Sequence, residues 1–136
     1  MRTAHDDSDR PRLLCIDDDP AVVAALTLRF KAYDVDVLTA FCGTQGIWQA
    51  IIKKPDAIIT DLRMPNGTGD YVVECLKCRS DTCNIPLFVL TGTHDRETRR
   101  RLMTLGVDGW LQKPADFRTL VEMVGKHVDL QALQTN

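Results

Sequence analysis

Residues 57–65 read AIITDLRMP, a short apolar run that ends in the carboxylate of Asp61. Three other apolar runs also end in polar groups. The groups that follow them are Asp17, Asp18 and Asp19 after the first run, Thr91 after the second, and Lys113 after the third. The carboxyl ends of neighbouring parallel strands form the binding edge of an open α/β sheet. The pattern therefore predicts one polar site with Asp61 at its centre.

Strand-like and helix-like segments alternate along the chain, and the strand-like ones are short apolar runs typical of buried parallel strands. The strand candidates are residues 12–16, 35–39, 56–60, 85–90 and 108–111. The helix candidates are residues 20–32, 43–53, 69–80, 94–105 and 115–128. Five βα units in a row predict an α/β, flavodoxin-like, doubly wound (βα)5 sandwich, with a five-stranded parallel sheet in the order 2-1-3-4-5.

Bulk properties indicate one soluble globular domain. The chain has 136 residues, a net charge of −2 and an apolar fraction of 44%. This charge gives no support to nucleic-acid or membrane-surface binding. No apolar stretch reaches transmembrane length or resembles a signal peptide. The five cysteines lack the spacing of a disulfide framework, which fits reduced thiols. We therefore expect a cytoplasmic protein. We expect a disordered arm at 1–11, a folded domain at 12–130 and a tail at 131–136.

The predicted site has the chemistry of a metal-assisted phosphoryl site. Asp17, Asp18 and Asp61 crowd negative charge into one crevice, and a hard divalent cation such as Mg²⁺ (or Mn²⁺) would offset that cost. Lys113 supplies a fixed positive charge, and Thr91 supplies a hydroxyl donor. Together these groups are suited to stabilising a phosphoryl group on a carboxylate.

Four motifs resemble the receiver domain of two-component response regulators. They are LLCIDDDP at 13–20, IITDLRMP at 58–65, VLTGT at 89–93 and GVDGWLQKP at 106–114. The resemblance covers about residues 12–128. It implies that Asp61 accepts a phosphoryl group from a sensor histidine kinase or phosphotransfer protein in a phosphorelay. It also implies a phosphoacceptor that promotes only its own phosphorylation and dephosphorylation, rather than an enzyme acting on other substrates.

The resemblance assigns the metal and phosphoryl contacts residue by residue. Asp18 resembles the direct Mg²⁺ ligand, and Asp17 resembles its acidic neighbour, which acts largely through water. The backbone carbonyl of Arg63 matches the third protein ligand. Lys113 resembles the lysine that pairs with the phosphoryl group, and its bond to Pro114 is expected to be cis, as in the family.

The resemblance also assigns a switch. Thr91 resembles the switch hydroxyl, and Trp110 occupies the place of the switch aromatic, which is usually Tyr or Phe. The larger Trp is expected to alter the usual rotamer exchange. Arg63 and Thr93 stand two residues after the acceptor and after the switch hydroxyl, where family members tune the lifetime of the phosphoryl group.

The surface from the fourth helix to the fifth is the usual output face of the family. It is expected to regulate a partner or output domain and to support a phosphorylation-dependent dimer. The run Arg99-Arg100-Arg101 lies there, either as a docking patch for an acidic partner or as a solvated helix face. Both a stand-alone regulator and a receiver cut from a longer chain remain open.

Alternative interpretations are weaker. A pseudo-receiver that never takes phosphate would not need Asp61, Thr91 and Lys113 together. A haloacid-dehalogenase-like phosphatase leaves Asp61 unexplained and lacks later metal-binding acids on a strand. Cys75, Cys78 and Cys83 have no fourth ligand nearby for zinc. Trp48, on the second helix, is expected to be partly buried by packing.

Overall fold

The computed structural model describes residues 10–63, 69–92 and 95–133. Over these residues five strands and five helices alternate. They are β1 (Arg12–Ile16), α1 (Pro20–Phe30), β2 (Asp36–Ala40), α2 (Gly43–Lys53), β3 (Ala57–Thr60), α3 (Gly69–Cys78), β4 (Leu87–Thr91), α4 (Arg96–Thr104), β5 (Gly109–Gln112) and α5 (Phe117–Gly125). Each strand begins within two residues of its predicted start. All neighbouring strands are parallel and their order is β2-β1-β3-β4-β5, which confirms the predicted fold class.

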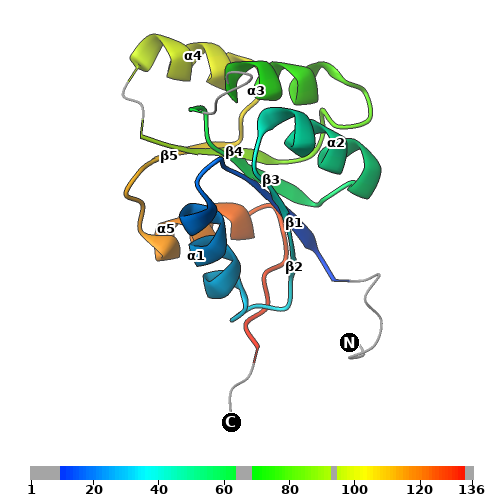
Figure 1. The fold of residues 1–136 in the computed structure, drawn as a ribbon, viewed down its shortest axis with the longest axis vertical. Helices are drawn as coiled ribbons and strands as arrows, with labels where there is room; N and C mark the ends of the chain where they lie inside the picture. Colours follow the sequence, from blue (N-terminus) through cyan, green and yellow to red (C-terminus); the bar gives the residue numbers. More distant parts are fainter. Residues whose placement is uncertain (1–9, 64–68, 93–94, 134–136) are drawn as a thin grey trace.

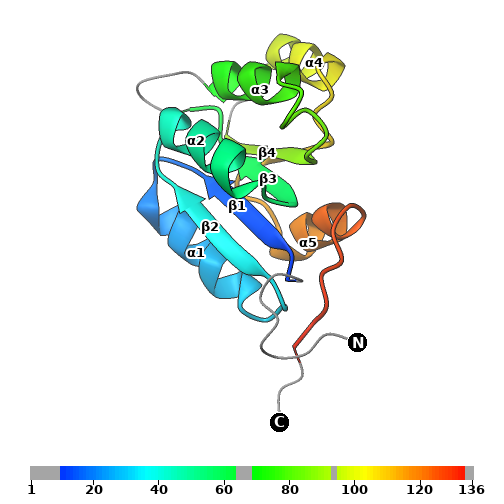
Figure 2. The ribbon, with the colours of Figure 1, turned by 90° about the vertical axis from the view of Figure 1, so that its right-hand side faces the viewer.

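Helices cover both faces of the sheet (Figures 1 and 2). The alternation of side chains along β1 shows how the two cores arise. Leu14 and Ile16 pack with α2, α3 and α4 in one buried cluster. Leu13 and Cys15 pack with α1 and α5 in the other. A strand that is buried on both faces needs apolar residues at every position, which is why these segments read as continuous apolar runs.

Local signals set the ends of several helices. The side chain of Asp19 accepts a hydrogen bond from the Ala21 amide at 2.9 Å, and Pro20 occupies the first turn of α1. Gly106 follows the end of α4 with φ of +105°, a backbone conformation that glycine adopts without steric cost. These local contacts fix where α1 begins and where α4 ends.

Contacts at both ends of the chain extend slightly beyond the predicted domain. Arg10 forms ion pairs with Asp34 at 3.1 Å and Asp36 at 3.3 Å. The Leu133 amide donates to the Ala32 carbonyl at 2.8 Å. Residues 1–9 of the predicted arm and residues 134–136 of the predicted tail lie outside the described residues. Within the described part of the chain, no helix is both long enough and apolar enough to cross a membrane.

Two surface residues differ from expectation. Trp48 is 59% exposed, so the prediction of partial burial is wrong. α2 packs on β1 and β2 at the β2 edge of the sheet, and Trp48 points away from them. The Arg99-Arg100-Arg101 run is also not one uniform patch. Arg101 reaches back to α3 and pairs with Asp70 and, at 2.6 Å, with Glu74.

Gly69 offers a test of the close approach between α3 and the segment after β3. A Cβ atom at Gly69 would lie 2.3 Å from the Leu62 Cα and 2.6 Å from the Asp61 carbonyl oxygen. Both are backbone atoms, so neither can move aside cheaply. We expect Gly69→Ala to lower the free energy of unfolding by about 1–3 kcal/mol in urea denaturation.

Gly125→Ala is the matched control, because no atom lies within 4 Å of the added Cβ in the last turn of α5. It should leave stability unchanged or raise it by up to ~1 kcal/mol through helix propensity. Equal stabilities for the two variants would contradict the packing described for Gly69.

Candidate functional site

The carboxyl ends of β1 and β3 place Asp17 and Asp61 side by side. The two strands are neighbours and Ile16 is paired with Thr60, so the residue after each strand emerges at the same edge of the sheet. The Asp61 amide donates to the Ile16 carbonyl at 3.0 Å. Both aspartates are buried.

Backbone amides fix the orientation of both carboxylates. Asp61 Oδ1 accepts a hydrogen bond from the Leu62 amide at 2.7 Å. Asp17 Oδ1 accepts one from the Asp19 amide at 3.0 Å. In each residue these bonds hold one oxygen and leave Oδ2 to face the crevice.

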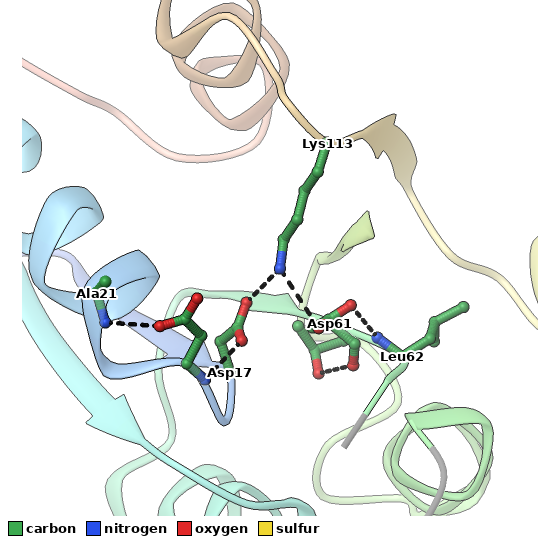
Figure 3. Close-up of polar contacts among 7 residues, drawn as sticks. Asp17, Ala21, Asp61, Leu62 and Lys113 are labelled. Atoms are coloured by element: carbon green, nitrogen blue, oxygen red, sulfur yellow. Dashed lines mark hydrogen bonds and ion pairs between the residues drawn. The ribbon is translucent and has the colours of Figure 1, made fainter. Parts of the chain in front are cut away.

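Lys113, the residue directly after β5, supplies the positive charge that balances the two carboxylates. Its ammonium Nζ lies 2.7 Å from Asp17 Oδ2 and 3.4 Å from Asp61 Oδ2 (Figure 3). The Lys113 amide donates to the Thr91 carbonyl at 2.8 Å, which fixes the start of the side chain beside the end of β4. The Lys113–Pro114 peptide bond is cis, as predicted from the family resemblance.

Burial and charge shift two pKa values in the crevice. Burial raises the pKa of Asp17 above its ordinary value, although the hydrogen bond and charge of Lys113 act in the opposite direction. Burial alone would lower the pKa of Lys113, but the hydrogen bond to Asp17 and the charges of Asp17 and Asp61 outweigh it and raise the pKa. Lys113 is therefore a permanent cation at neutral pH.

The acidic residues meet the donor requirement of a hard divalent cation. One carboxylate oxygen from each of Asp17, Asp18 and Asp61 can lie within 4.8 Å of the other two. Asp18 is exposed while the other two are buried, so the cluster opens to solvent on one side. Carboxylate oxygens of this kind fit Mg²⁺, which binds through few carboxylates and keeps several waters. Arg63 is exposed two residues after Asp61, and its role as a carbonyl ligand stays a prediction.

The cysteines do not form a comparable site. Among the residues that the structure describes, no group of three or more cysteine, histidine or acidic side chains other than the aspartate cluster could hold a metal ion. Cys15 lies in the core next to Asp17, and burial raises the pKa of its thiol to about 12, so it stays protonated.

Thr91 and Trp110 lie on the α4 side of the sheet. Thr91 is the last residue of β4 and is fully buried. Trp110 is paired in register with Val89 and packs, partly buried, against the cluster that includes Leu102 of α4. Thr93, the second predicted tuning position, lies outside the described residues, as does His94.

An apolar groove of about 610 Å³ adjoins the crevice, and Lys113 lines it. Its walls come from α1, the end of β4, the segment after β5 and the start of α5. They include Val22, Leu26, Pro114, Phe117 and Leu120. Helical spacing in the sequence shows that Val22 and Leu26 share a side of α1, but it does not show that this side and the start of α5 line one groove.

The Leu62 amide holds the Asp61 carboxylate. Sequence reasoning did not identify this contributor, because a backbone donor has no side-chain signature. The predicted side chains Asp17, Asp18, Asp61 and Lys113 do come together.

Comparison with known proteins agrees with this geometry. The response regulator receiver domain family matches residues 13–125. The chain is 34% identical over 116 residues to hybrid signal transduction histidine kinase D of Dictyostelium discoideum, covering 85% of this chain and 7% of that kinase. It is 32% identical over 114 residues to protein PilH of Pseudomonas aeruginosa, covering 83% of this chain and 93% of PilH.

Among solved structures, a response regulator receiver protein from Pseudomonas putida superposes with a TM-score of 0.81 at 30% identity. The match covers 86% of this chain and 97% of that one. The chain spans less than half the length of several curated relatives that it matches, so it corresponds to one part of those proteins. With five parallel strands in the expected order and a family match over most of its length, the chain belongs to the response regulator receiver domain family.

Proposed function

We propose that this receiver domain takes a phosphoryl group on Asp61 from the phosphohistidine of a sensor histidine kinase or phosphotransfer protein. The transfer breaks the P–N bond of the donor and forms a P–O bond to the Asp61 carboxylate, while the imidazole keeps the electron pair and takes up a proton. We place this reaction in the cytoplasm, as part of two-component signalling.

One observation carries the proposal: a single ammonium group contacts both buried carboxylates at the carboxyl edge of the sheet. Lys113 Nζ lies 3.4 Å from Asp61 Oδ2, and the Leu62 amide holds the other oxygen of that carboxylate. A protein promotes phosphoryl transfer mainly by positioning the reacting groups and by neutralising the charge on the phosphoryl oxygens. Lys113 supports both, because it is anchored through its own amide and carries a permanent positive charge.

The aspartate cluster would hold the divalent cation. Asp17, Asp18 and Asp61 supply carboxylate oxygens, and the Arg63 carbonyl is the further proposed ligand. Bound Mg²⁺ would supply neutralisation of the charge that develops on the phosphoryl oxygens. The apolar groove beside Lys113 gives the phosphodonor protein a surface to contact next to the crevice.

We further propose that phosphorylation of Asp61 is transmitted to the output face through β4 and β5. A phosphoryl group on Asp61 would attract the Thr91 hydroxyl and shift the packing of Trp110 against the cluster that includes Leu102 of α4. The α4-β5-α5 face would then regulate a partner or output domain, or pair with a second chain. Such a switch is a local charge change that biases a two-state element.

Phosphorylation of Asp61 is tested directly by incubating the chain with acetyl phosphate and Mg²⁺ and measuring intact mass. We expect a phosphoryl mass increment in the wild type and none in Asp61→Asn, because the amide is too weak a nucleophile. Asp81→Asn is the matched control, since Asp81 is exposed and pairs with Arg79 away from the crevice. An increment that survives in Asp61→Asn would contradict the assignment, and so would a wild type that takes no phosphoryl group from either acetyl phosphate or a phosphohistidine donor. The latter result would favour a pseudo-receiver.

Lys113→Met tests whether the Lys113 ammonium competes with a divalent cation for the aspartate carboxylates. Lys113 neutralises Asp17 at 2.7 Å, so its removal leaves more negative charge for a divalent cation. We expect Mg²⁺ to bind about three- to tenfold more tightly in isothermal titration calorimetry, at a reduced rate of phosphorylation. Weaker Mg²⁺ binding in this variant would show that Lys113 organises the cluster rather than competing with the cation.

Arg63→Ala tests the tuning position. The exposed Arg63 side chain stands two residues after the acceptor, where it can shield a phosphoryl group from water. We expect dephosphorylation to become about two- to tenfold faster, as followed by loss of the phosphoryl mass increment with time. An unchanged lifetime would rule out this role.

A further inference from the structure

The outer side of α2 carries an apolar surface that the phosphoryl site does not use. Trp48 is 59% exposed and Ile52 is 64% exposed. They stand four residues apart, so their side chains are neighbours on one face of the helix. Phe41, which is 45% exposed, lies two residues before α2, and its amide donates to Gln45 Oε1 at 2.8 Å. We call Phe41, Trp48 and Ile52 the α2 stripe.

The stripe faces away from the rest of the domain. α2 packs on β1 and β2 and against α3, and β2 is an edge strand of the sheet. The inner side of α2 is already buried through Gly46 and Ala50. Three large apolar side chains on the opposite side therefore contribute nothing evident to the core, and exposed apolar patches of this kind commonly mark interaction surfaces.

The charges around α2 have opposite signs at its two ends. No charged residue occurs from Gly43 to Ile52, and Lys53 and Lys54 follow at the carboxyl end. Neither lysine forms an ion pair with any residue that the structure describes. Near the amino end lies the acidic β1–α1 loop with the exposed Asp18 and Asp19, because the Asp17 amide donates to the Ala40 carbonyl at 3.1 Å.

We propose that the α2 stripe binds the α2 stripe of a second copy of this chain, with the two helices antiparallel. An antiparallel pair matches the stripe to itself without bringing like charges together. It also carries Lys53 and Lys54 of each copy toward the acidic loop at the amino end of the other, and it aligns the two helix dipoles favourably. This two-fold contact is distinct from a dimer formed through α4 and α5 and does not require phosphorylation.

The size of the stripe sets the strength of the contact. Its three side chains expose on the order of 300 Å² of apolar surface in each copy. Stable interfaces bury about 800 Å² per partner, so the dimer is weak and depends on concentration. We expect a Kd on the order of 0.1 mM.

Sedimentation equilibrium of the whole chain, from about 10 µM to about 1 mM, tests the proposal. The wild type should follow a monomer–dimer equilibrium, and Trp48→Ser/Ile52→Ser should weaken it about tenfold or more. Lys53→Glu/Lys54→Glu should weaken it as well, because like charges then face each other. These side chains are exposed, so the variants are expected to keep the fold, which circular dichroism checks.

Two variants distinguish this contact from other sources of association. Leu28→Ser removes an equally exposed apolar side chain (66%) from α1, on the opposite face of the sheet, and should leave the equilibrium unchanged. Asp61→Asn should also dimerise like the wild type, whatever the fate of the phosphorylation proposal. A chain that stays monomeric throughout the concentration range overturns the inference, and so does a dimer that Leu28→Ser weakens as much as the α2 variant.

Discussion

The contact of one lysine with two buried aspartates is the constraint on which the rest of the site depends. Asp17 and Asp61 come from neighbouring strands, and without a cation their charges would repel each other in a poorly hydrated crevice. Lys113 reaches them from β5, which is separated from β3 by β4. The hydrogen bond from its backbone amide to the Thr91 carbonyl fixes where this side chain starts. The sheet order thus serves to bring three strand ends together.

The same strands connect the crevice to a distant surface. β4 and β5 run in register, with Thr91 beside Gln112 and Val89 beside Trp110. Thr91 ends at the crevice, while Trp110 packs against the cluster that α4 covers. We propose that a change of charge at Asp61 reaches α4 through these two strands. The bridge from Arg101 to Asp70 and Glu74 ties α4 to α3 and would have to adapt to any movement of α4.

Much of this architecture could be predicted from the sequence, because buried parallel strands and strand-end polar residues leave strong patterns. The strand order, the meeting of Asp17, Asp18, Asp61 and Lys113, and the cis bond before Pro114 were all predicted. Three features were not. The exposure of Trp48 depends on which elements flank α2, the division of the arginine run depends on the reach of Arg101 to α3, and the amide that holds Asp61 has no side chain to reveal it. Each arises from tertiary placement rather than local pattern.

A phosphoryl group that Asp61 accepts on its side chain would form an acyl phosphate. Borohydride reduces such an acyl phosphate to an alcohol and so converts the modified aspartate to homoserine. Peptide mapping of the phosphorylated and reduced chain by mass spectrometry therefore locates the acceptor directly. We expect homoserine at position 61 and aspartate at positions 17 and 18. Homoserine at either of those two positions, or aspartate retained at position 61 in a phosphorylated chain, would contradict this expectation.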